Sequence, residues 1–165
     1  MKHLILIGLP GSGKTTAGRA LANALQLPFS DCDEAVEQAA HMTVPEIFRR
    51  EGEPGFRARE TAALQALTAL PARIIACGGG VVTVPANRPL LRSGVVIFWD
   101  RSPGDIMSTC QLADRPLLQS TTLARLWEQR LPLYQAWADA VVDARDFDAA
   151  VARAAALWRE KTCDF

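Results

Sequence analysis

The sequence has no excess of charge of either sign. Its 18 lysines and arginines match its 18 aspartates and glutamates, so the formal net charge of the 165 residues is zero at pH 7. Neither end of the chain carries a run of like charges. Proteins that bind nucleic acids or membrane surfaces usually present a basic patch or tail. The composition therefore argues against a nucleic-acid partner and against a membrane partner.

Long apolar runs and paired cysteines are also missing. No apolar run approaches the roughly 18 residues that cross a bilayer, and the first run ends at Gly8, too early for a signal peptide. The four cysteines form no C-x-x-C pair and the two histidines lie far apart, which argues against a zinc site and a disulfide framework. We expect a cytoplasmic protein with reduced thiols, folded as one domain over residues 1–165. We also expect a monomer, because no long exposed apolar helix face stands out.

Short apolar runs alternate along the chain with stretches of helical periodicity. This alternation predicts an α/β fold in which helices wrap a parallel sheet. One helix start has a full set of signals, since Thr43 is a predicted N-cap, Glu46 its capping-box partner and Pro45 a residue of the first turn. The expected strands cover residues 4–7, 28–30, 73–76, 95–99 and 140–142, the longer helices cover 14–25, 56–70, 123–136 and 147–159, and a polar loop covers 114–122.

A phosphate-binding motif follows the first predicted strand. Residues 8–15 read Gly-Leu-Pro-Gly-Ser-Gly-Lys-Thr and match G-x-x-x-x-G-K-[ST], between a strand and a helix as the motif requires. Glycines let backbone N–H groups converge on phosphate oxygens, and the helix N-terminus adds partial positive charge. Lys14 can reach the outer phosphates, and the Thr15 hydroxyl can bind Mg²⁺. We therefore expect a bound nucleoside triphosphate, with a plain glycine-rich turn as the alternative, and the residues expected to hold it are Gly11, Ser12, Gly13, Lys14, Thr15 and Thr16.

A carboxylate that would complete a magnesium site is less evident. Asp100 follows the strand at 95–99, but helix capping or a surface pair is its preferred interpretation. Asp31 and Asp33 follow the second strand, and residues two apart in a strand point the same way, here toward the ligand crevice of an open α/β sheet. One of them can hold a magnesium-bound water, and the other can accept a proton from a substrate hydroxyl. The alternative is that Asp33 caps a helix starting near Glu34.

Two further segments favour an anionic substrate. Arg57 and Glu60 lie three residues apart on one face of a predicted helix, beside the apolar Phe56. This arrangement suits anion binding, or else forms a surface salt bridge. Three glycines follow a predicted strand at residues 78–80, where they allow a ligand to approach the backbone closely or else form a flexible loop.

Two more arginines are candidate site residues. Arg115 lies in the polar loop, where an arginine on a mobile flap can stabilise charge on a transferring phosphoryl group and exclude water. Its alternative role is that of a solvated loop residue. Arg130 lies in a helical stretch that Pro132 kinks or restarts.

Together these features resemble the shikimate kinase family, in family order and over nearly the whole chain. The resemblance implies a three-layer P-loop kinase fold with a five-stranded parallel sheet in the order 2-3-1-4-5, substrate-binding helices at about 33–60 and a mobile lid at about 112–122. It also implies ATP- and Mg²⁺-dependent phosphorylation of the 3-hydroxyl of shikimate, toward chorismate and the aromatic amino acids. The segments that carry it are residues 8–16, Asp31-Cys32-Asp33, Gly52-Glu53, the Phe-Arg-x-x-Glu of 56–60, Gly78-Gly79-Gly80, Arg115-Pro116-Leu117-Leu118 and 130–134.

The resemblance further implies how the substrate is bound. Asp33 would contact the shikimate hydroxyls, and Arg57 and Arg130 would bind the carboxylate. Glu60 would orient Arg57. The glycines would form a wall of the substrate site, with a backbone contact from the middle one, and they are Gly78, Gly79 and Gly80.

The residues expected to take part in catalysis are Lys14 and Arg115, beside the phosphates, and Asp33, beside the acceptor hydroxyl. Arg115 would lie on the lid over the ATP phosphates. Asp31 would support Mg²⁺ through water, beside the Thr15 hydroxyl.

The sequence departs from the family pattern near the expected adenine site. Ser108 stands where family members commonly carry an arginine, and Arg145 is a candidate for the adenine loop. Three alternatives remain open at this stage: a gluconate kinase, a nucleoside monophosphate kinase, and a regulatory domain that binds nucleotide without turnover.

Overall fold

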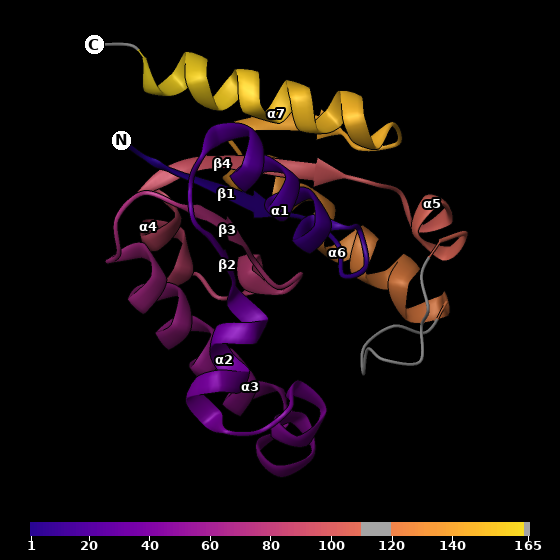
Figure 1. Ribbon diagram of the computed structural model, residues 1–165. Helices are drawn as coiled ribbons and strands as arrows, with labels where there is room; N and C mark the ends of the chain where they lie inside the picture. Colours follow the sequence, from indigo (N-terminus) through magenta and orange to yellow (C-terminus); the bar gives the residue numbers. More distant parts are fainter. Residues whose placement is uncertain (110–119, 164–165) are drawn as a thin grey trace.

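The computed structural model describes residues 1–109 and 120–163. In these residues, five parallel strands form one sheet in the order β2-β3-β1-β4-β5 (Figure 1). The predicted fold class and strand order are confirmed. The strands are β1 (His3–Ile7), β2 (Phe29–Asp31), β3 (Ile74–Ala76), β4 (Gly94–Asp100) and β5 (Ala140–Asp143).

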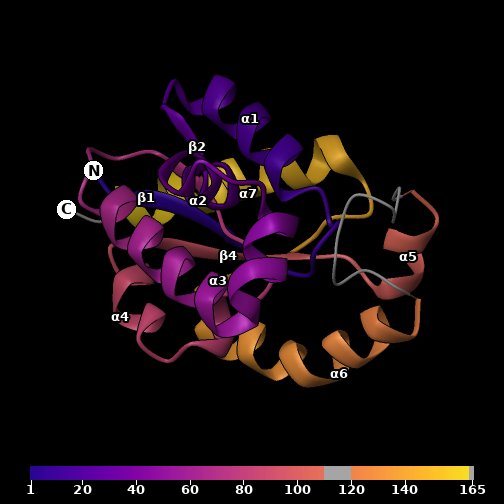
Figure 2. The same ribbon diagram turned by 90° about the horizontal axis from the view of Figure 1, so that it is seen from below.

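Helices cover both faces of the sheet (Figure 2). Successive residues of a strand point to opposite faces, so Leu4 and Leu6 of β1 pack with α1 and α7, whereas Ile5 and Ile7 pack with α3, α4 and α6. Every residue of β1 is buried, which explains why this strand shows no polar alternation. None of the described helices is long and apolar enough to cross a membrane. The helices are α1 (Lys14–Leu25), α2 (Cys32–Ala40), α3 (Val44–Thr68), α4 (Asn87–Leu91), α5 (Pro103–Met107), α6 (Ser120–Trp137) and α7 (Phe147–Thr162), with a 3₁₀ turn, η1 (Val81–Thr83).

Some element boundaries differ from those expected. β2 lies one residue later than predicted, and α6 begins at Ser120 and not at residue 123. Residues 120–122 are therefore helical, and the loop predicted for them is wrong. Serine and threonine favour the start of a helix, although their polarity is also typical of a loop. The rest of the predicted loop, with Arg115 and residues 112–119 of the expected lid, lies outside the described residues.

Helix α3 begins where its capping signals predict but is longer than expected. Thr43 Oγ1 accepts a hydrogen bond from the Glu46 N–H, and Glu46 Oε2 accepts one from the Thr43 N–H, both at 3.3 Å. The helix predicted for residues 56–70 is confirmed with different bounds: helical turns run from Val44 to Thr68 with a break at Gly52 (φ 70°, ψ −175°), so the stretch after the break starts earlier than residue 56 and ends at Thr68. Glycine tolerates this backbone conformation. Pro54 is accommodated because it lies in the first turn after the break.

Candidate functional site

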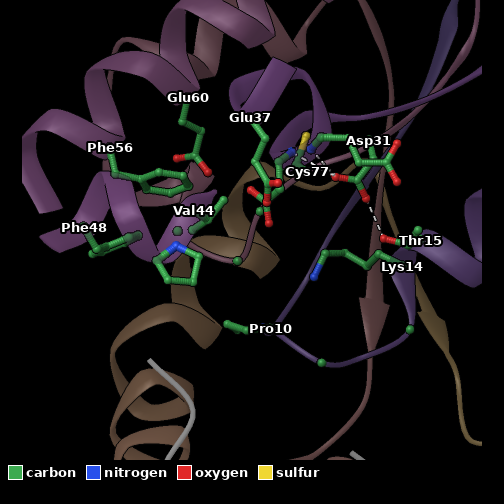
Figure 3. Close-up of a pocket in the computed structure, with 18 of the residues that line it drawn as sticks. Pro10, Lys14, Thr15, Asp31, Glu37, Val44, Phe48, Phe56, Glu60 and Cys77 are labelled. Carbon is green, nitrogen blue, oxygen red and sulfur yellow. Dashed lines mark hydrogen bonds between the residues drawn. The ribbon is translucent and has the colours of Figure 1, made fainter. Parts of the chain in front are cut away.

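A cavity of about 560 Å³ opens at the carboxyl ends of β1, β2 and β3. Ligands bind at this edge in open α/β sheets, because the segments that follow the strands converge there. Figure 3 shows Lys14, Thr15 and Asp31 on one side of the cavity and the rings of Phe48 and Phe56 on the other. The cavity brings together most of the predicted site residues, namely Gly11, Gly13, Lys14, Thr15, Thr16, Asp31, Asp33, Arg57, Glu60, Gly78, Gly79, Gly80 and Arg130.

The phosphate-binding loop is held in place by backbone contacts. Gly13 adopts a left-handed conformation (φ 91°, ψ 21°) as the N-cap of α1, which few residues other than glycine adopt readily. The buried Lys14 ammonium donates hydrogen bonds to the carbonyl oxygens of Gly8 (2.8 Å) and Leu9 (2.7 Å). The carbonyl oxygen of the buried Ser12 accepts a hydrogen bond from the indole N–H of Trp99, at 3.1 Å. Strand β4, which carries Trp99, therefore anchors the loop.

Asp31 joins the phosphate-binding loop to the acidic helix α2. Its Oδ2 accepts a hydrogen bond from the Thr15 hydroxyl at 2.5 Å, and its Oδ1 accepts from the N–H groups of Asp33 (2.9 Å) and Glu34 (3.2 Å). Asp31 is therefore the N-cap of α2, and the suggestion that Asp33 caps the helix is wrong. The prediction that both aspartates share one strand face is also wrong, because the strand ends at Asp31 and the helix begins at Cys32. Asp33 reaches the cavity from the first turn of the helix instead.

Arg57 lies between two glutamates of its own helix. Its Nη1–H donates to Glu60 Oε1 at 3.0 Å, and its Nε and Nη2 donate to Glu53 Oε1 at 3.4 and 3.2 Å. The Arg57 side chain is 10% exposed and that of Glu60 is fully buried, so this pair is not a surface salt bridge. Burial raises the pKa of Glu60, and the charges of Arg57 and Arg130 offset that rise only in part. Glu53 had no assigned role, although its position four residues before Arg57 is a signal for the contact.

The glycine triplet is a packing surface and not merely a flexible loop. A Cβ on Gly78 would lie 2.5 Å from Glu60 Oε2, and one on Gly79 would lie 2.5 Å from Cδ of Pro10 in the phosphate-binding loop. A Cβ on Gly80 would overlap the Arg57 guanidinium. Any side chain at these positions would therefore displace the arginine, the glutamate or the loop.

Helix α6 brings two buried polar side chains to the same wall. Arg130 is 4% exposed, and its Nη1 has no hydrogen-bond partner among the described residues. One turn later, the Tyr134 hydroxyl donates to the Gly79 carbonyl oxygen at 2.6 Å, and its ring stacks on Phe98 with 5.1 Å between centroids. Burial raises the pKa of Tyr134 to about 12, so the phenol remains a hydrogen-bond donor at neutral pH.

An apolar wall faces the charged groups across the cavity. It consists of Val44, Pro45, Phe48 and Phe56 of α3, and the two phenylalanine rings lie 4.7 Å apart. Such a wall suits the carbon skeleton of a small ring or polyol. This surface was not predicted from the sequence, since apolar residues of an amphipathic helix more often lie in the core.

The predictions for the nucleotide-base end have mixed outcomes. Ser102, and not Asp100, caps α5, so the capping role suggested for Asp100 is wrong. Ser108 ends α5, with its hydroxyl bonded to the Asp105 carbonyl at 2.8 Å. Arg145 is exposed and pairs with Asp143 at 2.6 Å. No contact with a base follows from these positions, and the phosphate role of Arg115 stays a prediction because that residue lies outside the described ones.

Comparison with known proteins gives consistent matches. A family model described as shikimate kinase matches residues 10–157. A shikimate kinase of Synechococcus sp. (strain CC9605) is 44% identical over 139 residues, which cover 81% of this chain and 70% of that protein. A shikimate kinase of Pseudomonas entomophila (strain L48) is 44% identical over 149 residues, covering 87% of each chain.

Solved structures give the same picture. The shikimate kinase from Acinetobacter baumannii in complex with shikimate superimposes with a TM-score of 0.89 at 35% identity, over 98% of this chain and 93% of that one. A gluconokinase from Sinorhizobium meliloti 1021 has a TM-score of 0.64 at 16% identity, over 99% of this chain and 94% of that one. At that identity the second likeness concerns the fold alone.

Proposed function

The chain belongs to the shikimate kinase family, and from that premise we propose that it transfers the γ-phosphoryl group of ATP to the 3-hydroxyl of shikimate. One observation carries the proposal: a single cavity joins a phosphate-binding loop to a wall that contains two buried arginines, Arg57 and Arg130. A nucleotide and an anionic acceptor can therefore meet in one enclosed space. Holding the phosphoryl donor and the acceptor hydroxyl close together raises the rate of a reaction that depends on positioning.

The acceptor half of the cavity fits a small carboxylated polyol. Arg57 and Arg130 would bind the carboxylate through charge-assisted hydrogen bonds, and Glu60 would hold Arg57 from behind. Asp33 would accept hydrogen bonds from the hydroxyls. The Gly79 backbone would contact the substrate, and the ring carbons would lie against the apolar wall of α3.

The transfer itself would depend on positioning and on charge stabilisation. The new bond joins the substrate oxygen to Pγ while the bond from Pγ to the bridging oxygen of ADP breaks, and the hydroxyl proton passes to Asp33. Lys14 would leave the loop carbonyls to neutralise the outer phosphates. Arg115, on a lid, would stabilise the same charge from the other side and exclude water.

The residues beside the loop fit Mg²⁺. This ion prefers oxygen ligands and commonly binds through one or two carboxylates together with substrate phosphates. The Thr15 hydroxyl and the Asp31 carboxylate already lie 2.5 Å apart at the loop, so one would bind the ion directly and the other through water. When bound, the ion would neutralise charge on the β- and γ-phosphates.

The decisive test is ADP release in a coupled assay with ATP and Mg²⁺, across shikimate, gluconate and several nucleoside monophosphates. We expect turnover with shikimate alone and none after magnesium is chelated. Turnover with another acceptor would reassign the enzyme to a different small-molecule kinase. ATP binding without any turnover would make the chain a regulatory domain. Gel filtration during purification would test our further expectation of a monomer.

A further inference from the structure

The carbonyl groups of the glycine triplet are all engaged, but by different parts of the chain. The Gly78 oxygen accepts from the Val81 N–H (3.2 Å) and the Gly80 oxygen from the Thr83 N–H (3.0 Å), both within one tight turn. The Thr83 hydroxyl adds a second bond to the Gly80 oxygen at 2.6 Å. The Gly79 oxygen differs, because its donor is the Tyr134 hydroxyl, 55 positions further along the chain.

Tyr134 is itself held rigidly. It is fully buried, its ring stacks on Phe98 of the central sheet, and it lies on the same helix as Arg130, one turn away. Helix α6 thus presents one side chain toward the expected substrate carboxylate and another toward the glycine backbone.

Gly79 also touches the nucleotide side of the cavity. Its Cα packs so closely on Pro10 that an added Cβ would lie 2.5 to 2.9 Å from the Cδ, Cγ and backbone nitrogen of that proline. Pro10 belongs to the phosphate-binding loop. A shift of Gly79 would therefore change the spacing between the acceptor wall and the loop.

We propose that Tyr134 is a positioning residue for phosphoryl transfer: through its hydrogen bond it fixes Gly79, and through Gly79 it sets the distance between the acceptor and the phosphate-binding loop. This inference rests on the proposed function. Tyr134 need not touch either substrate to act in this way. Loss of the Tyr134 hydrogen bond should affect shikimate binding and the chemical step but not ATP binding, because Lys14 and Thr15 keep their own contacts.

The first experiment compares wild type with Tyr134→Phe, which removes one oxygen and keeps the ring. Loss of a hydrogen bond of typical net strength should raise the KM for shikimate about fivefold, lower kcat, and leave the KM for ATP within about twofold. The matched control is Thr83→Val, which removes a hydroxyl bond to the neighbouring Gly80 oxygen but leaves the Thr83 N–H bond in place. We expect this control to keep wild-type constants for both substrates.

The second experiment uses the fact that Tyr134 is the only tyrosine in the chain. Expression in cells grown on a fluorinated tyrosine, whose phenol ionises at lower pH, introduces the analogue at this one position. Ionisation turns the donor into an acceptor and breaks the bond to the Gly79 oxygen, so the shikimate KM should rise with pH in the fluorinated enzyme and not in the native one. This test remains valid if Tyr134→Phe does not fold.

The outcomes separate the two proposals. Absence of shikimate turnover in the wild type would refute the proposed function. Normal turnover with wild-type constants in Tyr134→Phe, or equal losses in Thr83→Val, would each refute the positioning role alone. So would a constant shikimate KM in the fluorinated enzyme over a pH range in which the phenolate absorbance shows that the tyrosine ionises.

Discussion

Replacement of Glu60 by glutamine tests the role of a buried charge in the acceptor site. Glu60 is fully buried and accepts the Arg57 Nη1–H at 3.0 Å. The glutamine oxygen can still accept this bond from the charged guanidinium, but the Coulomb attraction between the two buried ions is lost. A loss of about 1 kcal/mol corresponds to a fivefold change in an equilibrium constant. We expect the shikimate KM of Glu60→Gln to rise about fivefold relative to wild type at a pH above the folded pKa of Glu60, where the wild-type carboxyl is ionised.

The pH dependence of this difference follows from the pKa of Glu60. Burial raises that pKa above the ordinary value of 4.5, so Glu60 loses its charge at a higher pH than an exposed glutamate would. As the pH falls through the raised pKa, the wild-type KM should approach that of the variant. The free energy of unfolding depends on pH in the opposite direction. A carboxyl group whose pKa is raised by folding stabilises the folded protein while it is protonated, and this stabilisation is lost when it ionises. Wild type should therefore become less stable relative to Glu60→Gln as the pH rises from 4.5 through the folded pKa.

The assay is shikimate kinetics with parallel thermal melts, measured from the ordinary pKa of 4.5 upward until the difference between wild type and variant no longer changes with pH. Glu51→Gln is the matched control, because Glu51 lies on the same helix but pairs with Arg59 at 2.7 Å on an exposed surface. The hydrogen bond from Arg59 lowers the pKa of Glu51, so the contribution of Glu51 to the stability of the fold is lost as the pH falls. The shikimate KM of Glu51→Gln should equal that of wild type. A KM ratio of Glu60→Gln to wild type that does not vary with pH would refute the argument.

The remaining predictions concern the loop, the carboxylate site and the thiols. Lys14→Ala should abolish ADP release while its circular dichroism stays native, and a rate above about a tenth of wild type would contradict the loop's role. Arg57→Ala should raise the shikimate KM about 10- to 150-fold, from a bond of about 1.5–3 kcal/mol, and an unchanged KM would mean that the carboxylate binds elsewhere. Among the cysteines that the structure describes, Cys163 is exposed, and mass spectrometry after brief iodoacetamide treatment should find it modified. Burial raises the pKa of Cys32 and Cys77, so rapid labelling of either would contradict the structure.

Much of the fold could be predicted because its signals are local. The apolar residues 4–7 form a strand that is buried on both faces, and the Thr43–Glu46 capping box marks a real helix start. The Gly-rich motif required a strand before it and a helix after it, and both are present. The i, i+3 spacing of Arg57 and Glu60 was sufficient to predict their contact.

The rest depends on contacts that sequence spacing does not reveal. Asp31 caps α2 and bonds to Thr15 because the strand ends at Asp31, two residues before the end of the D-x-D pattern. Gly79 must be small because Pro10 packs on it, and its carbonyl oxygen is held by Tyr134, so both partners lie far away in the chain.

The break at Gly52 has a consequence for how the specificity of this site can change. The wall residues Val44, Pro45 and Phe48 precede the break, whereas Arg57 and Glu60 follow it. Gly52 resets the backbone between them, and the Phe48–Phe56 ring contact is a direct link across the joint. Residues 44–51 therefore form a segment on one side of the break that carries three of the four wall residues. Substitutions in this segment should alter which ring or chain the cavity accepts, while Arg57 keeps its contacts with Glu53 and Glu60.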